Sequence, residues 1–223
     1  IHGRPSNWVD CFVHGKWAYV SGDLPVFPEY NDTRNVSEEV ISPIPGTTVI
    51  VGIDFGLTPA AVFVQQLNGQ YIVIDEIVTT NMGAKRMGAE IRKLLQRKYH
   101  NCPVEVWGDP AGEQRAQTDE NTPFMMLASE GVNAAPTHTN DFSVRREAVA
   151  SLLLGTTMTG LPSLIINENC LVLRRGLSGD YKYNRIQISG TARYSEKPNK
   201  SSSSHVCDAL GYALLGAGEG HAV

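Results

Sequence analysis

A regular pattern of apolar residues begins at Thr47 and first predicts three β-strands. Residues 47–54 are rich in β-branched side chains and contain an apolar run that is typical of a buried strand. Residues 60–66 and 71–78 form a second and a third strand, joined by an Asn-Gly turn within 67–70. Because these connections are short, we expect the three strands to form an antiparallel meander.

The period then changes to that of a helix, since Met87, Ile91 and Leu94 recur at helical spacing within residues 84–99. The same criteria predict further strands at 104–107 and 164–166, helices at 124–130, 142–154, 168–177 and 205–215, and a hairpin over 181–194. The serines at 201–204 offer an N-cap for the last helix. This order predicts an α/β fold, with a mixed sheet that carries helices on its faces.

Residues 1–46 show no such period and contain four prolines between positions 25 and 45, which exclude a long helix. We therefore expect a linker or N-terminal extension over 1–46, followed by one domain over 47–223. A length of 223 residues with 42% hydrophobic residues suits one domain with a sizeable core. No apolar run approaches the roughly 20 residues that span a membrane, so we expect no membrane association.

Three aspartates are candidates for chemistry because of where they lie. Asp54 in G-I-D-F-G and Asp109 in W-G-D-P-A-G each follow a predicted strand, at the sheet edge where α/β proteins bind ligands. Asp208 lies in the apolar helix H-V-C-D-A-L-G-Y-A-L, close to the face that meets the sheet. Each alone also fits a turn or a helix cap. Together they would repel one another without a cation, and hard divalent cations take carboxylate oxygens.

Four stretches together resemble the RNase H-like nuclease domain of viral large terminase subunits, the motors that package DNA into bacteriophage capsids. They are residues 26–36, 52–56, 108–112 and 197–214. The resemblance implies an RNase H-like α/β fold, with a central mixed sheet of five strands flanked by helices and an added β-hairpin. It also implies that residues 1–46 lead from an ATPase domain. No G-x-x-x-x-G-K-[ST] phosphate loop is present, so we expect DNA cutting and not ATP-driven translocation.

The resemblance also implies a catalytic and metal-binding triad. Asp54 would bridge two Mg²⁺ or Mn²⁺ ions, Asp109 would hold one and Asp208 would complete the other. His205 matches a position that lies beside the metals in some members, although a cap or surface histidine is the alternative. Glu113 and Glu76 stay open as assisting groups. The implied activity is two-metal hydrolysis of double-stranded concatemeric DNA during packaging, with little sequence specificity.

The implied partners are double-stranded DNA, the ATPase domain, the small terminase subunit and the capsid portal. We expect the protein in the host cell cytoplasm during infection, not secreted, and this portion to be a monomer. Three alternatives remain. They are another RNase H-like nuclease such as a Holliday-junction resolvase, an actin-like or sugar-kinase-like ATPase suggested by G-I-D-F-G-L-T, and a DNA-docking lobe without activity.

Total charge gives no indication of nucleic-acid binding, because 19 basic residues stand against 23 acidic ones, a net charge of −4. The distribution of charge along the chain does indicate nucleic-acid binding. Residues 174–200 carry seven basic and two acidic residues, interleaved with tyrosines, and from them we expect DNA phosphate contacts by Lys182, Arg185, Arg193, Lys197 and Lys200. The six basic residues within 85–98 fit a solvated helix face. Arg145 and Arg146 are interpreted as surface charges.

Overall fold

A six-stranded mixed sheet forms the centre of the protein, whose computed structural model describes residues 23–56, 58–113, 121–186 and 193–220. The strand order is β6-β5-β2-β3-β4-β7. The central strands β2, β3 and β4 pair antiparallel as the predicted meander, whereas β5, β6 and β7 add in parallel. The strands are β2 (Val49–Asp54), β3 (Ala60–Leu67), β4 (Gln70–Val78), β5 (Val104–Gly108), β6 (Ala135–Pro136) and β7 (Leu164–Ile166).

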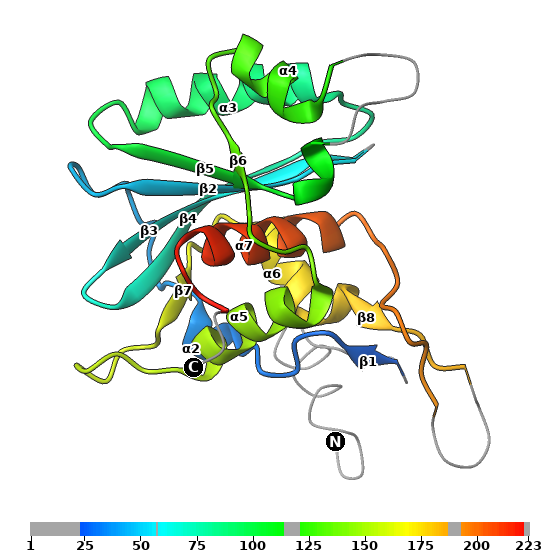
Figure 1. Cartoon of the computed structure of the whole chain (residues 1–223). Helices are drawn as coiled ribbons and strands as arrows, with labels where there is room; N and C mark the ends of the chain where they lie inside the picture. The colour runs from blue at the N-terminus through cyan, green and yellow to red at the C-terminus, as the bar shows by residue number, and fades with distance from the viewer. Residues whose placement is uncertain (1–22, 57, 114–120, 187–192, 221–223) are drawn as a thin grey trace.

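Helices cover both faces of this sheet (Figure 1). On one face, α3 and α4 bury Met87, Ile91 and Leu127 against β2, β3 and β4. On the other, α5, α6 and α7 enclose a second apolar cluster. The helices are α2 (Asp32–Asn35), α3 (Ala84–Lys98), η1 (Pro110–Glu113), α4 (Pro123–Ser129), α5 (Phe142–Leu154), α6 (Leu171–Arg175), η2 (Gly176–Asp180) and α7 (Ser204–Gly216). Among the described residues, none of these helices is long and apolar enough to cross a bilayer.

Local sequence explains most of these boundaries. Asn68 and Gly69 both have positive φ, 51° and 80°, as the tight turn between β3 and β4 requires. The side chain of Asp141 caps α5 by accepting hydrogen bonds from the N–H groups of Ser143 and Val144 at 2.7 and 3.2 Å. These are short-range signals, and the corresponding elements lie within one or two residues of their predicted positions.

Three details differ from the prediction. The two-residue strand β6 makes six strands where five were expected. The helix expected over 168–177 is instead the short α6 followed by the π-helical η2, in which Gly179 has a φ of 133°. The last helix begins at Ser204, but the side chain of its N-cap, Ser203, makes no capping hydrogen bond and donates to Asp180 at 2.6 Å. That serine already satisfies a carboxylate, so it is not available as a cap.

The tip expected for the hairpin, residues 187–192, lies outside the described residues. Its base is described. Arg185 and Tyr194 form an antiparallel bridge, and β8 (Lys182–Tyr183) pairs antiparallel with β1 (Leu24–Pro25). The base of the hairpin is therefore joined to the N-terminal segment.

The N-terminal segment packs against the sheet domain from residue 23 onward. Val26 and Phe27 are buried in the cluster formed by α5, α6 and α7. Asn35 is fully buried, and its side-chain amide donates to the carbonyl oxygens of Leu153 and Leu164 at 3.2 Å each. The boundary at residue 46 stays a prediction, but residues 23–46 share their core with the residues that follow.

One close contact fixes α7 on the sheet. A Cβ atom at Gly52 in β2 would lie 2.1 Å from the carbonyl oxygen of Ala209 and 2.5 Å from the backbone nitrogen of Ala213. Backbone atoms cannot yield as a flexible side chain can, so only glycine admits α7 at this depth. Every side chain that α7 presents to the sheet is positioned by this contact.

We predict that Gly52→Ala lowers the free energy of unfolding by at least about 2 kcal/mol, because the added methyl group forces α7 away from β2. Gly83→Ala is the matched control, since a Cβ at Gly83 would meet nothing within 4 Å. Urea denaturation measures both. Equal stability of the two variants would contradict the role of the Gly52 contact.

Candidate active site

Asp54 and Asp109 lie at the carboxyl ends of adjacent strands and face the same helix. Ile53 of β2 pairs in parallel with Gly108 of β5, so the two aspartates follow neighbouring positions. Side chains alternate along a strand, and Asp54 therefore shares the face of Gly52, which meets α7. The sequence prediction that both acids lie at this sheet edge is consistent with the structure.

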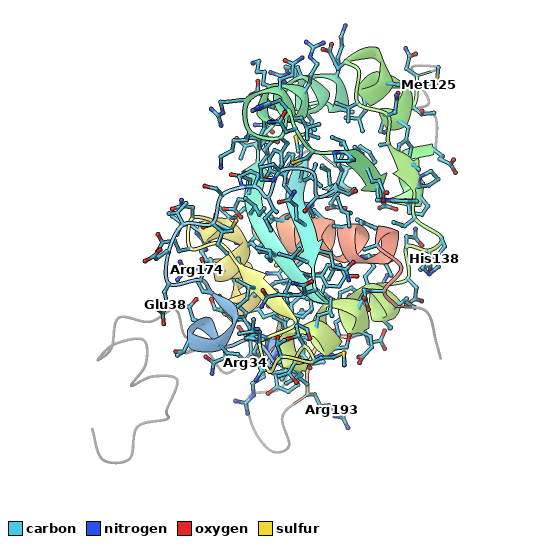
Figure 2. All side chains as sticks on the ribbon, turned by 90° about the vertical axis from the view of Figure 1, so that its left-hand side faces the viewer. Arg34, Glu38, Met125, His138, Arg174 and Arg193 are labelled. Carbon is cyan, nitrogen blue, oxygen red and sulfur yellow. The ribbon has the colours of Figure 1, made fainter. Side chains whose placement is uncertain are left out.

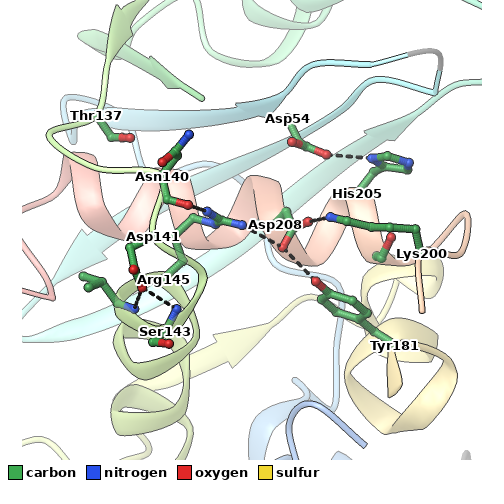
Figure 3. A network of polar contacts seen from close by, with 12 residues as sticks. Asp54, Thr137, Asn140, Asp141, Ser143, Arg145, Tyr181, Lys200, His205 and Asp208 are labelled. Atoms are coloured by element: carbon green, nitrogen blue, oxygen red, sulfur yellow. Dashed lines mark hydrogen bonds and ion pairs between the residues drawn. The ribbon is translucent and has the colours of Figure 1, made fainter. Parts of the chain in front are cut away.

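Asp208 projects from α7 and is almost completely buried, with 4% of its side chain exposed. Three groups surround its carboxylate (Figure 3). The Tyr181 hydroxyl donates to Oδ1 at 3.3 Å, an Arg145 Nη2 lies 3.5 Å from Oδ1, and the Lys200 ammonium donates to Oδ2. A buried carboxylate needs such partners, because an unpaired charge in a protein interior is strongly destabilising.

Asp54 is bound to His205, which lies one residue into α7. The two side chains are joined by a contact of 2.7 Å between Nδ1 of the imidazole and Oδ2 of the carboxylate. Burial raises the pKa of Asp54, and the nearby charge of Asp208 raises it further, while the hydrogen bond from His205 opposes both. Figure 3 shows Asp54 and His205 directed toward each other above Asp208.

Asp109 is less enclosed than the other two acids. Its Oδ1 accepts a hydrogen bond from the N–H of Ala111 at 2.9 Å, and it lines a mostly apolar hollow of about 360 Å³ together with Phe55 and Pro123. Tyr212 lies one turn beyond Asp208 on α7; burial raises the pKa of its hydroxyl, and the negative charge of the nearby Asp109 raises it further. Asp54 and Asp109 therefore face the side of α7 from which Asp208 projects. A tyrosine lies beside two of these three acids, Asp109 and Asp208.

Arg145 is the site residue that the sequence interpretation missed. It was assigned to the surface, and this was wrong, because only 9% of its side chain is exposed. Its guanidinium lies 4.7 Å from the centre of the Tyr212 ring and contacts both Asp208 and the carbonyl oxygen of Asn140. The signal was present in the sequence, since Arg145, Ala148 and Val149 fall on one buried stripe of α5.

The two glutamates left open lie outside this group of acids. Glu76 accepts hydrogen bonds from the N–H groups of Val172 and Leu173 at 2.9 and 2.8 Å, so it caps α6. Glu113 is exposed at the end of η1.

The five basic residues expected to contact DNA have different surroundings. Lys182 forms an ion pair with Asp23 at 3.0 Å, and Lys200 contacts Asp208. Arg193 and Lys197 are exposed, and Figure 2 shows Arg193 at the opposite end of the molecule from Met125 of α4. Arg185 is exposed too, and its backbone N–H donates to Asp23 at 3.0 Å. Their role in DNA binding stays a prediction.

The donor set fits one hard divalent cation better than two. No group of three or more His, Cys, Asp or Glu side chains close enough to hold a metal occurs among the described residues. Mg²⁺, however, binds proteins through one or two carboxylates and keeps several waters. Asp54 and Asp208 form such a pair, and this pair already attracts cationic side chains. Asp109, which accepts a hydrogen bond from the N–H of Ala111, would join only after rearrangement.

Several solved structures resemble this chain in fold. The P22 large terminase nuclease domain aligns with a TM-score of 0.61 at 14% identity, covering 90% of this chain and 93% of that one. The nuclease of the large terminase from thermophilic phage G20c, solved with bound magnesium, aligns with a TM-score of 0.56 at 15% identity, covering 86% and 98%. The chain has the fold of a large terminase nuclease domain. The RNase H-like fold predicted from the sequence is thereby confirmed.

A longer large terminase, from another thermophilic bacteriophage, shows the same likeness. In complex with ATP-γ-S, that protein aligns with a TM-score of 0.63 at 15% identity over 93% of this chain. The present chain spans about half the length of that terminase, 52% in this alignment. No protein-family model matches the sequence, and no curated protein matches it either. At these identities the likeness to the terminase nuclease domains is one of fold.

The raised pKa of Asp54 predicts that Asp54→Asn stabilises the metal-free protein at neutral pH. A carboxyl whose pKa is raised on folding contributes stability below its ordinary pKa of 3.8, and this is lost as pH rises through the folded value. Melting temperatures in EDTA from pH 3.5 to 8 should therefore show a gain for Asp54→Asn that grows with pH. Glu90→Gln, a solvent-accessible acid on α3, should show none; a gain independent of pH would contradict the mechanism.

Proposed function

We propose that this protein is the nuclease portion of a phage large terminase and that it cuts double-stranded DNA during genome packaging. The observation that carries the proposal is the buried pair of Asp54 and Asp208, which brings two carboxylates from facing elements into one charged cluster. A fold that only needed stability would place apolar residues there, because ionised groups cost free energy when they leave water. Buried clusters of titratable groups with shifted pKa values are common at catalytic and binding sites.

Each residue of the cluster has a distinct proposed task. Asp54, at the carboxyl end of β2, and Asp208 on α7 would together hold one divalent ion. Asp109, at the end of the neighbouring strand, would contribute to a second ion once it leaves its present partner, the N–H of Ala111. Arg145 holds Asp208 in place from α5, and His205 orients Asp54 from α7. Two bound ions would supply activation of the attacking water and stabilisation of the leaving oxygen.

Divalent metal dependence is supported by the neighbours of similar fold. The G20c large terminase nuclease has been solved with magnesium and also with cobalt bound. We propose Mg²⁺ or Mn²⁺ for this chain, because its candidate ligands are carboxylate oxygens, which hard cations prefer.

Phosphate contacts without base contacts would give binding of little sequence specificity. We propose that Arg193 and Lys197, at the described base of the hairpin, provide part of this contact. In the complete protein, an ATPase domain, the small terminase subunit and the portal are the proposed partners, and the infected cell's cytoplasm is the proposed location. The structures of the longer thermophilic-phage terminase with ADP and ATP-γ-S support the link to an ATPase.

Incubation of supercoiled plasmid with the protein and Mn²⁺ or Mg²⁺ should yield nicked and then linear DNA, and EDTA should abolish the reaction. Asp54→Asn should lower the rate by at least about a hundredfold, because it removes one of the two carboxylates that would hold the metal. Glu90→Gln on the surface of α3 is the matched control and should cut like the wild type. Equal cutting by the Asp54→Asn protein would contradict the proposed site.

Reversal of charge at both Arg193 and Lys197, by Arg193→Glu with Lys197→Glu, should weaken DNA binding about tenfold at low salt. The dependence of log K on log salt concentration should become shallower by about 1 for each phosphate that the protein no longer neutralises. Lys85→Glu with Arg97→Glu makes the same change of charge on exposed α3 and should have the smaller effect. Fluorescence anisotropy with a labelled duplex measures both, and equal weakening in the two variants would contradict a specific DNA surface on the hairpin.

A further inference from the structure

Lys200 and Arg145 both neutralise Asp208, but they are held very differently. Arg145 has 9% of its side chain exposed, stacks on Tyr212 and donates to the carbonyl oxygen of Asn140. Lys200 has 55% of its side chain exposed while its ammonium reaches the buried carboxylate. Arg145 therefore cannot leave without disrupting the core, whereas Lys200 can move into solvent.

The backbone on either side of Lys200 is fixed independently of this ion pair. The N–H of Asn199 donates to the carbonyl oxygen of Lys182 at 2.7 Å, which ties the segment to β8. On the other side, the Ser204 hydroxyl donates to the carbonyl oxygen of Ser201 at 2.8 Å at the start of α7. Release of the ammonium therefore needs only rotation about the bonds of the lysine side chain.

The ammonium contacts the carboxylate pair that would hold a metal. It contacts Oδ2 of Asp208, and its positive charge partly opposes the rise in the pKa of Asp54 that burial causes. Its distance to the centre of the Tyr181 ring is 5.7 Å, so it lies over an aromatic face that also favours cations. One cation position is thus filled by the protein itself.

We propose that Lys200 is an exchangeable counter-ion of Asp208, which a divalent cation displaces when it binds to Asp54 and Asp208. The ammonium stabilises the buried carboxylates in the metal-free protein and competes with the metal for them. Because the same amine cannot contact Asp208 and a DNA phosphate together, metal binding would also determine when Lys200 is available to DNA. The proposal rests on the proposed nuclease function, since it uses the same two carboxylates.

Calorimetric titration of the DNA-free protein with Mn²⁺ tests the exchange directly. Lys200→Met keeps the length of the aliphatic stem and removes the charge, so it should bind Mn²⁺ about tenfold more tightly than the wild type. Lys85→Met is the control, a lysine on α3 that is exposed and has no ion pair among the described residues; it should bind like the wild type. Unchanged or weaker Mn²⁺ binding by Lys200→Met would overturn the proposal.

Two further measurements separate exchange from a purely structural role. In EDTA, Lys200→Met should melt at a lower temperature than Lys85→Met, and saturating Mn²⁺ should remove this difference, because the metal then replaces the missing charge. Lys200→Arg keeps the charge with a forked donor and should bind Mn²⁺ no more tightly than the wild type. A melting difference that persists at saturating Mn²⁺ would indicate a structural contact and contradict exchange.

Failure of the proposed function gives a different result. If neither the wild type nor Lys200→Met binds Mn²⁺, both the nuclease site and the exchange are wrong. If the wild type binds Mn²⁺ and cuts plasmid while Lys200→Met binds no more tightly, only the exchange is wrong.

Discussion

The direct packing of helix α7 on strand β2 is the contact on which the rest of the site depends. Gly52 has no side chain, so the backbone of α7 at Ala209 and Ala213 approaches the strand closely. That depth places Asp208, one residue before Ala209, in the interior opposite Asp54, which lies two residues beyond Gly52 on the same face of the strand. A sheet and helix held further apart would leave the carboxylates in solvent, where their charges would be screened and their geometry would not be fixed.

Burial of the Asp54 and Asp208 carboxylates lowers the stability of the metal-free protein, and the surrounding residues offset this loss only in part. Desolvation and mutual repulsion raise the pKa of Asp54, so the metal-free protein holds its ionised carboxylate at the expense of stability. Arg145, Tyr181 and Lys200 compensate at Asp208. The arrangement is therefore most favourable when a further cation is present, as expected of a site whose carboxylates bind a metal.

Much of this architecture follows from short-range signals in the sequence. Apolar periodicity and the Asn68-Gly69 turn predict the meander and its flanking helices, and strand ends predict where Asp54 and Asp109 lie. The partners of Asp208 could not be predicted in the same way, because Arg145 meets it across 63 positions of sequence. Such a contact depends on how α5 and α7 pack, and no local pattern specifies this. The helical periodicity of α5 does indicate that Arg145 is buried, because Arg145 falls on the same stripe as the buried Ala148 and Val149.

The balance of charge within the site would also link the proposed metal binding to the proposed binding of DNA. Without metal, Arg145 and Lys200 both contact Asp208, and these two cations balance the charges that Asp54 and Asp208 carry when both are ionised. If a divalent ion takes the place of Lys200 while Arg145 stays, the cluster gains one positive charge. A phosphodiester carries one negative charge, so the metal-loaded site would favour a DNA phosphate that the metal-free site does not. The net charge of −4 for the whole chain conceals this, because attraction for DNA would arise locally and only when the cation is bound.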